Sequence, residues 1–74
     1  MNTTIQLKTE HIALAAALKL AGIVGSGGEA KHLIQEGLVH LNGKPDRRRG
    51  AKVRAGDSIF VNVDPPQRIV VDAS

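Results

Sequence analysis

The dipeptide Asn42-Gly43 is the feature that most restricts how this chain can fold. A two-residue hairpin loop of type I′ needs positive φ at both positions, and Asn followed by Gly adopts that conformation most readily. The apolar residues before it predict a strand over Leu38–Leu41, and the dipeptide predicts that the chain then reverses direction. A β-hairpin therefore lies in the middle of the chain, and the other elements are arranged around it.

Further strands are predicted on both sides of this hairpin. They are Thr3–Leu7, Ser58–Val63 and Arg68–Asp72, separated by turns at Gly56-Asp57 and Pro65-Pro66. Alternation of polar and apolar residues places Ile5 and Leu7 on one face of the first strand. In the same way it places Ile59, Val61 and Val63 on one face of the second. Each of these two strands is therefore expected to bury one face.

A helix is predicted immediately before the hairpin. Ser26-Gly27-Gly28-Glu29 matches the capping box, in which the serine and glutamate side chains accept hydrogen bonds from free amides at a helix start. Gly37 is expected to end this helix. Helical spacing separates an apolar side from a polar side. The core-facing residues are Ala30, Leu33 and Ile34, and the water-facing residues are Lys31, His32, Gln35 and Glu36.

An earlier helix is predicted over the alanine-rich segment Ile12–Ala21, with Gly22 as its C-terminal stop. Local rules make Thr9 its N-cap and start the helix near Glu10. With 74 residues, the chain is long enough for one domain with one small core. We therefore expect a single domain over residues 1–74.

Positive charge is concentrated in one segment. The net charge of the chain is +3, but Lys44–Arg54 alone carries six cations and one acid, a local charge of +5. The remaining residues are slightly acidic. Such an asymmetry predicts a polyanionic partner.

Several classes of function are not supported by the residues present. The chain has no cysteine, and its three histidines, at positions 11, 32 and 40, lack metal-ligand spacing. No nucleophile, carboxylate pair or metal cluster is evident, so we expect no catalysis and no cofactor. The longest apolar run, Ile12–Leu18, is too short to cross a membrane, and we expect a cytoplasmic protein without a membrane partner.

The glycine-rich segment Gly25–Gly28 raises the question of nucleotide binding. It lacks the lysine of a P-loop. It matches the dinucleotide fingerprint only superficially, because a helix rather than a strand is predicted to precede it. A helix start nevertheless favours anions through its free amides and its dipole. Gly27, Gly28 and Lys31 are therefore candidate contacts for a phosphate.

The motif series LKLAGIVGSGGEAKHLIQEG, VHLNGK, RRR and AGD resembles the S4-type RNA-binding domain, or αL motif. The likeness covers about residues 12–61 and is strongest to small stand-alone bacterial members. It implies an α+β fold with two short helices packed on a small, highly twisted, mostly antiparallel sheet, and a motif core over about 12–63. In such domains the second helix and the adjacent hairpin form the RNA surface.

The resemblance also assigns individual positions. The matching residues are Ser26, Glu29, Ala30, Lys31, Ile34, Gly37, Val39, Asn42, Gly43, Gly56 and Asp57. The chain departs from the family at Gly27, where most members have arginine, and at Ala13-Leu14-Ala15, where many have an Arg-Leu-Asp step. The family pattern also starts the first helix nearer Leu14 than Glu10.

The run Arg47-Arg48-Arg49 offers compensation for the missing family arginine. Its ordinary explanation is a solvated charge run that protects a sheet edge. Lys44, Lys52 and Arg54 nearby favour phosphate binding instead, for which arginine is better suited than lysine. Adjacent side chains on a strand point in alternating directions, so we expect at most two of the three arginines to share a face.

The single phenylalanine constrains the kind of RNA. Phe60 is the only Phe, Trp or Tyr residue, and its position on a core strand predicts that it is buried. No aromatic stacking platform is then available for unpaired bases. We therefore expect RNA that is structured or double-stranded, ribosomal or transfer RNA among the candidates, bound by a monomer through the phosphate backbone.

The predicted RNA-binding residues come from the second helix and the basic segment. They are Ser26, Gly27, Gly28, Lys31, His32, Gln35, Lys44, Arg47, Arg48, Arg49 and Lys52. Two alternatives remain open at this point: a module whose basic hairpin docks an acidic protein, and a helix-turn-helix that reads DNA. Exposed Glu29 and Glu36 on the second helix disfavour the DNA alternative.

Overall fold

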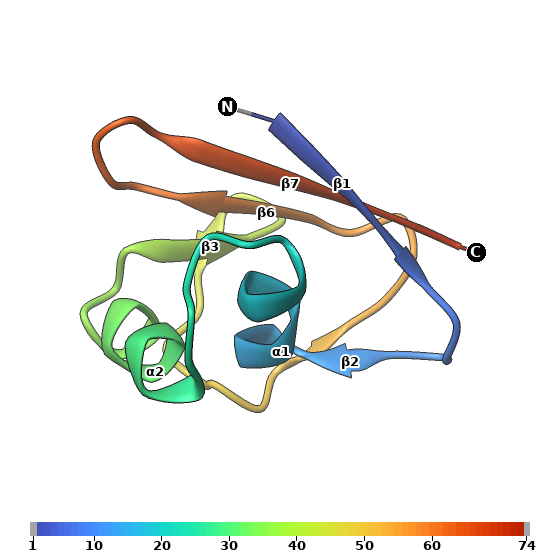
Figure 1. Cartoon of the computed structure of the whole chain (residues 1–74), viewed down its shortest axis with the longest axis horizontal. Helices are drawn as coiled ribbons and strands as arrows, with labels where there is room; N and C mark the ends of the chain where they lie inside the picture. The colour runs from blue at the N-terminus through green and yellow to red at the C-terminus, as the bar shows by residue number, and fades with distance from the viewer. Residues whose placement is uncertain (1, 74) are drawn as a thin grey trace.

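Two helices cover one face of a five-stranded sheet in the computed structural model of the protein, which describes residues 2–73 (Figure 1). The elements in chain order are β1 (Asn2–Leu7), β2 (Ile12–Ala13), α1 (Leu14–Leu20), α2 (Gly27–Gln35), β3 (Val39–Leu41), β4 (Lys44–Pro45), β5 (Lys52–Val53), β6 (Ser58–Val61) and β7 (Gln67–Ala73). The larger sheet has the strand order β1-β7-β6-β3-β4, and β2 pairs with β5 in a separate two-stranded sheet. The predicted α+β class is confirmed.

Strand pairing is antiparallel except between β1 and β7. These two strands run parallel from the pair Asn2 and Arg68 to the pair Leu7 and Ala73, which brings the two ends of the described chain into one sheet. The expectation of a mostly antiparallel sheet is therefore correct, and the parallel pair is an addition to it.

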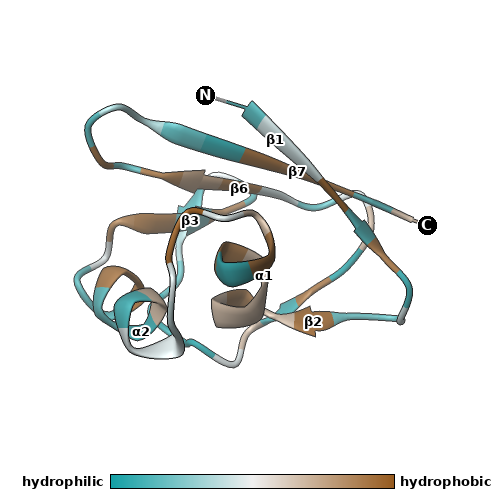
Figure 2. Cartoon of the chain, in the orientation of Figure 1, coloured by the Kyte–Doolittle hydropathy of each residue, from teal (hydrophilic) through white to brown (hydrophobic). Residues whose placement is uncertain are grey.

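The core lies between the sheet and the helices and consists of aliphatic side chains. Its members are Ile5, Leu7, Leu14, Ala17, Leu18, Val24, Ala30, Ile34, Val39, Ala51, Val53, Ile59, Val61, Ile69 and Val71. Within residues 2–73 no polar or charged residue is buried. Burial alternates along the second half of β1, where Ile5 and Leu7 are buried and Gln6 between them is exposed. Figure 2 shows hydrophobic segments on the strands and helices that surround this core.

The central hairpin has the predicted turn. Asn42 has a φ of 52° and Gly43 a φ of 86°, as a type I′ turn requires. The Asn42 side chain also joins the hairpin to the next turn, because its Nδ2 donates to Asp57 Oδ1 at 3.0 Å and its Oδ1 accepts from the Ser58 amide at 2.9 Å. The Asn42 amide also donates to the Ser58 carbonyl oxygen at 2.8 Å, so both the backbone and the side chain of Asn42 hold the tip of the hairpin in place.

Helix α1 begins at Leu14, so the start near Glu10 that local rules predicted is wrong and the start taken from the family pattern is correct. Thr9 does not cap the helix, since its hydroxyl donates to the His11 carbonyl oxygen at 2.9 Å. The residues before Leu14 form β2 instead of a helical turn. The helix ends as predicted, with Gly22 at a φ of 76° just beyond its C-cap.

Helix α2 is capped largely as the sequence indicated. Ser26 Oγ accepts from the Glu29 amide at 3.2 Å, as in a capping box. The Glu29 carboxylate accepts from the Gly25 amide at 3.4 Å, one residue earlier than the capping box places it. Gly37 ends the helix at a φ of 79°.

The prediction that Phe60 is buried in the core is wrong. Ile59 and Val61 are fully buried on the inner face of β6, and side chains of consecutive strand residues point to opposite faces. Phe60 is therefore on the outer face of the sheet, where it is half-buried. The strand ends at Val61, and Val63 packs against the core from outside it.

Candidate nucleic-acid interface

The N-terminus of α2 exposes its backbone. A methyl group placed on Gly27 would meet no atom within 4 Å, and one placed on Gly28 would meet only Ser26 Oγ at 3.9 Å. Packing therefore does not require glycine at either position. Because the first amides of a helix have no intrahelical acceptor, bare backbone here leaves a phosphate room to approach them.

The exposed side of α2 continues from this end of the helix. Lys31 and Gln35 are both exposed, and their spacing of four residues puts them on the same side of the helix. They extend the exposed surface along the helix toward its C-terminus.

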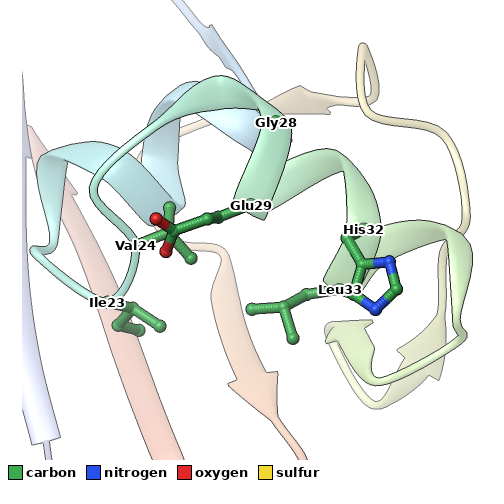
Figure 3. A pocket seen from close by; sticks show the side chains of 6 residues that line it. All are labelled: Ile23, Val24, Gly28, Glu29, His32 and Leu33. Atoms are coloured by element: carbon green, nitrogen blue, oxygen red, sulfur yellow. The ribbon is translucent and has the colours of Figure 1, made fainter.

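His32 belongs to different surroundings from Lys31. It lines a pocket of about 410 Å³ together with Ile23, Val24, Gly28, Glu29 and Leu33. Ile23 and Leu33 point toward one another across this pocket (Figure 3). The pocket is apolar with one carboxylate and no lysine or arginine, which is poor chemistry for a phosphate.

The arginine-rich segment leaves the sheet after β4 and forms a loop that we call the arginine loop, residues 46–51. Its backbone caps α1: the Leu14 amide donates to the Ala51 carbonyl oxygen at 2.9 Å, and the Ala15 amide donates to the Arg49 carbonyl oxygen at 3.1 Å. Helix α1 has no side-chain cap, so these carbonyl oxygens take that role. The loop backbone is thereby fixed, while its three arginine side chains stay at the surface.

The three arginines of this loop lie in three different environments. The Arg47 guanidinium lies beside Gly37, such that a methyl group on Gly37 would come within 3.1 Å of Arg47 Nη2. A cation at this place complements the negative end of the α2 dipole. Arg49 is exposed and takes part in no ion pair that the structure records for residues 2–73.

Arg48 is paired with Asp46. Its Nε and Nη2 donate to the two oxygens of the Asp46 carboxylate at 3.1 and 2.9 Å, and its backbone amide donates to the same carboxylate at 3.0 Å. These hydrogen bonds from Arg48 lower the pKa of the Asp46 carboxyl. One of the cations counted in the sequence is therefore already partly neutralised.

A second pocket, at the end of the arginine loop, is lined by several positively charged side chains. Its volume is about 450 Å³, and Arg48, Gly50, Ala51, Lys52 and Arg54 line it. Arg54 is absent from the site predicted from sequence, although it belongs to the basic segment. The signal was present, because Lys52 on β5 and Arg54 just after it are both exposed on either side of the buried Val53.

The predicted residues thus form two groups rather than one cluster. One group is at the N-terminus of α2, and the arginine loop lies against Gly37, just beyond the other end of that helix. The nine residues of α2 correspond to a length of roughly 14 Å. No hydrogen bond or ion pair recorded between described residues joins the two groups. Lys44 is exposed on the edge strand β4, which leads into the arginine loop.

Residues 2–73 contain no group of three or more side chains able to hold a metal ion. Among these residues, neither helix has the length and apolar composition that crossing a membrane requires.

Comparisons with known proteins give consistent matches. The family model of the S4 domain matches residues 5–71. A Bacillus subtilis (strain 168) protein named "Probable ribosome maturation protein RlbA" is 44% identical over 61 residues, which cover 82% of this chain and 86% of that protein. An Escherichia coli (strain K12) protein named "Putative RNA-binding protein YbcJ" is 38% identical over 52 residues, or 70% of this chain and 74% of that protein.

The fold also has a match among solved structures. A trimeric structure of Vibrio cholerae Heat Shock Protein 15 superimposes with a TM-score of 0.76 over 88% of this chain, at 21% sequence identity. The match spans 66% of that protein. At this identity the likeness concerns the arrangement of helices and strands.

Proposed function

The chain belongs to the S4 domain family, and on that premise we propose that it is a non-catalytic protein that binds structured RNA through the phosphate backbone. The names of two relatives, "Putative RNA-binding protein YbcJ" and "Probable ribosome maturation protein RlbA", support this class of partner. Ribosomal RNA is the target that the second name favours. We further propose that the protein acts as a monomer in the cytoplasm.

The fixed arginine loop is the observation that carries this proposal. Its carbonyl oxygens are committed to the first amides of α1, so its backbone does not have to become ordered when a ligand binds. Arg49, Lys52 and Arg54 are exposed on and next to it. A preorganised cluster of guanidinium and ammonium groups with little competing acid suits successive phosphates of a folded RNA.

The N-terminus of α2 is proposed as the weaker part of the interface. Its contacts would be the amides of Gly27 and Gly28 and the side chains of Ser26, Lys31 and Gln35. The family's usual arginine is replaced by Gly27 here, so this end of the helix offers backbone and one ammonium group. Since neither glycine is required by packing, the exposed amides have room for a close approach by the RNA backbone.

Paired charge reversals test the proposal. Arg47→Glu combined with Arg49→Glu removes two cations of the arginine loop. Lys8→Glu combined with Lys19→Glu changes the net charge equally at two exposed positions outside the interface. The readout is affinity for an RNA hairpin over a series of salt concentrations, with thermal unfolding recorded for each variant.

The loop variant is expected to lose at least tenfold in affinity, and its salt slope to fall by roughly 1.5 because two phosphate contacts are lost. The control variant should stay within a few-fold of the natural chain. Equal losses in both variants would show that net charge alone drives binding. An acidic protein and duplex DNA are tested as competitors for the bound RNA hairpin. If either binds the protein more tightly than the RNA does, the surface is assigned to that competitor.

A further inference from the structure

The five-stranded sheet has one face that neither helix covers (Figure 1). Both helices pack on the opposite face, and burial along β7 follows this division. Ile69 and Val71 are fully buried, whereas Arg68 and Asp72 are exposed and Val70 is 40% exposed. The uncovered face is therefore a surface of the molecule.

An aromatic and cationic row crosses this face. His40 on β3 is paired in register with Phe60 on β6, which is paired with Arg68 on β7. The rings of His40 and Phe60 are 5.9 Å apart between centroids and inclined by 51°. Arg68 Cζ lies 5.7 Å from the centroid of the Phe60 ring, within the range of a cation–π contact. Three π-bearing groups from three adjacent strands thus lie side by side.

Two features of the row differ from an ordinary solvated sheet surface. Nδ1 of His40 is buried and has no hydrogen-bond partner. Val70 lies diagonally across from Phe60 in the register of β6 and β7. Among the described residues, Val70 and Leu20 are the two large apolar residues that are exposed. The centre of the face is therefore apolar and aromatic, with the guanidinium of Arg68 at the same place.

We propose that this row is a second nucleic-acid site, at which an unpaired base of the bound RNA stacks on Phe60 and Arg68. Proteins bind single-stranded RNA by stacking bases on aromatic rings and guanidinium planes of an open sheet, next to cations that hold the backbone. The proposal rests on RNA being the ligand of the arginine loop. It adds an unpaired segment to the structured RNA proposed above.

The row is connected to the arginine loop through the sheet. Pro45 on β4 is paired with His40, and Asp46, the first residue of the loop, follows directly. Strands are spaced by about 4.8 Å, so Phe60 lies roughly 10 Å from β4 across the sheet. A single strand that leaves a helix bound at the loop can cover this distance within a few nucleotides. At the far end of the row, the Arg68 guanidinium is a cation that can contact the phosphate backbone of this RNA strand.

A pair of RNA probes isolates the second site. One probe is a blunt hairpin, and the other is the same hairpin with a short single-stranded extension. We expect the extension to raise affinity for the natural chain about tenfold, as one stacked base can. Phe60→Leu should abolish that gain while leaving blunt-hairpin affinity unchanged, and Phe60→Tyr should retain it. Leu20→Ala, an exposed apolar residue on α1, serves as the matched control.

The same probes can be followed at the ring itself. Phe60 is the only phenylalanine and the chain has no tyrosine or tryptophan, so its ring protons form a single, readily assigned set in an NMR spectrum. Intermolecular NOEs between this ring and base protons of the extension are expected. Equal affinity for the two probes, or a gain that survives Phe60→Leu, would overturn the second site. If the natural chain binds neither RNA probe, the proposed function itself is overturned.

Discussion

Removing the carboxylate of Asp46 is expected to strengthen RNA binding. Asp46 holds Arg48 through hydrogen bonds of 2.9 and 3.1 Å, and the Arg48 side chain is still 79% exposed. Asp46→Asn keeps an oxygen for the Arg48 amide but removes the charge that competes with phosphate. The local charge of the basic segment rises from +5 to +6.

The size of the effect follows from counterion release. One additional phosphate contact steepens the dependence of log K on log salt by about 0.7 to 0.9. Relative to 1 M salt, where such a contact adds nothing, this corresponds at 0.1 M salt to about a five- to eightfold gain in affinity, and the gain shrinks as the salt concentration rises. Titration of a labelled blunt RNA hairpin by fluorescence anisotropy, at several salt concentrations, measures both quantities.

Two comparisons make this prediction decisive. Asp72→Asn changes the net charge equally on β7, away from the arginine loop, and should leave affinity almost unchanged. In an Arg48→Ala background, Asp46→Asn should no longer increase affinity, because the two residues act as a coupled pair. A loss of affinity in Asp46→Asn, with thermal stability intact, would show that Asp46 positions Arg48 for RNA rather than competing for it.

The same pair makes a prediction about stability and pH. Arg48 lowers the pKa of Asp46 in the folded chain, so the carboxylate stabilises the fold above the unfolded-state pKa of about 4. This contribution is lost as the pH falls through the lower, folded-state pKa. The difference in unfolding temperature between the natural chain and Asp46→Asn should therefore narrow below pH 4. A constant difference across that range would contradict the assigned pairing.

Substitutions at three positions test local elements of the site. Ser26→Ala removes the α2 cap and should cost about 1 kcal/mol, lowering the unfolding temperature by roughly 4–8 °C in a thermal melt. Gly37→Ala places an alanine at a backbone position with positive φ, which should lower the free energy of unfolding in urea by about 1–2 kcal/mol. The new methyl group also displaces the Arg47 guanidinium, so RNA affinity should fall as well. Asn42→Ala should lower the free energy of unfolding more than Asn42→Gly does. Both variants lose the side-chain hydrogen bonds of Asn42, but only alanine is disfavoured at positive φ. Equal unfolding free energies of the two variants would refute this explanation.

Features that depend on neighbouring residues were predictable from the sequence. The cap at Ser26 and the turn at Asn42-Gly43 follow from conformations that a few adjacent residues determine. The start of α1 was not predictable in this way, because its capping oxygens belong to Arg49 and Ala51, far along the chain. Alternation along β1 fixed which face is buried, but it carries no information on the partner strand or its direction.

The position of Phe60 was available from the sequence and was misjudged. Ile59 and Val61 had been assigned to the inner face, and a strand period of two then requires Phe60 to point outward. The expectation of burial came from residue type, which is a weaker guide than position within an alternating strand. This correction matters for function, because it converts an argument against base stacking into the main support for a second site.

The composition of the basic segment overstates the charge that is available to a ligand. Arg47-Arg48-Arg49 is a run of one residue type, yet Arg47 lies at the end of α2, Arg48 is bound to Asp46, and only Arg49 is free of both restraints. The difference arises from the loop backbone, which is fixed by its bonds to α1 and so directs each side chain to a separate environment. A charge count cannot show this. Asp46 is therefore the informative position, because changing it alters the availability of one cation without moving the loop that presents the others.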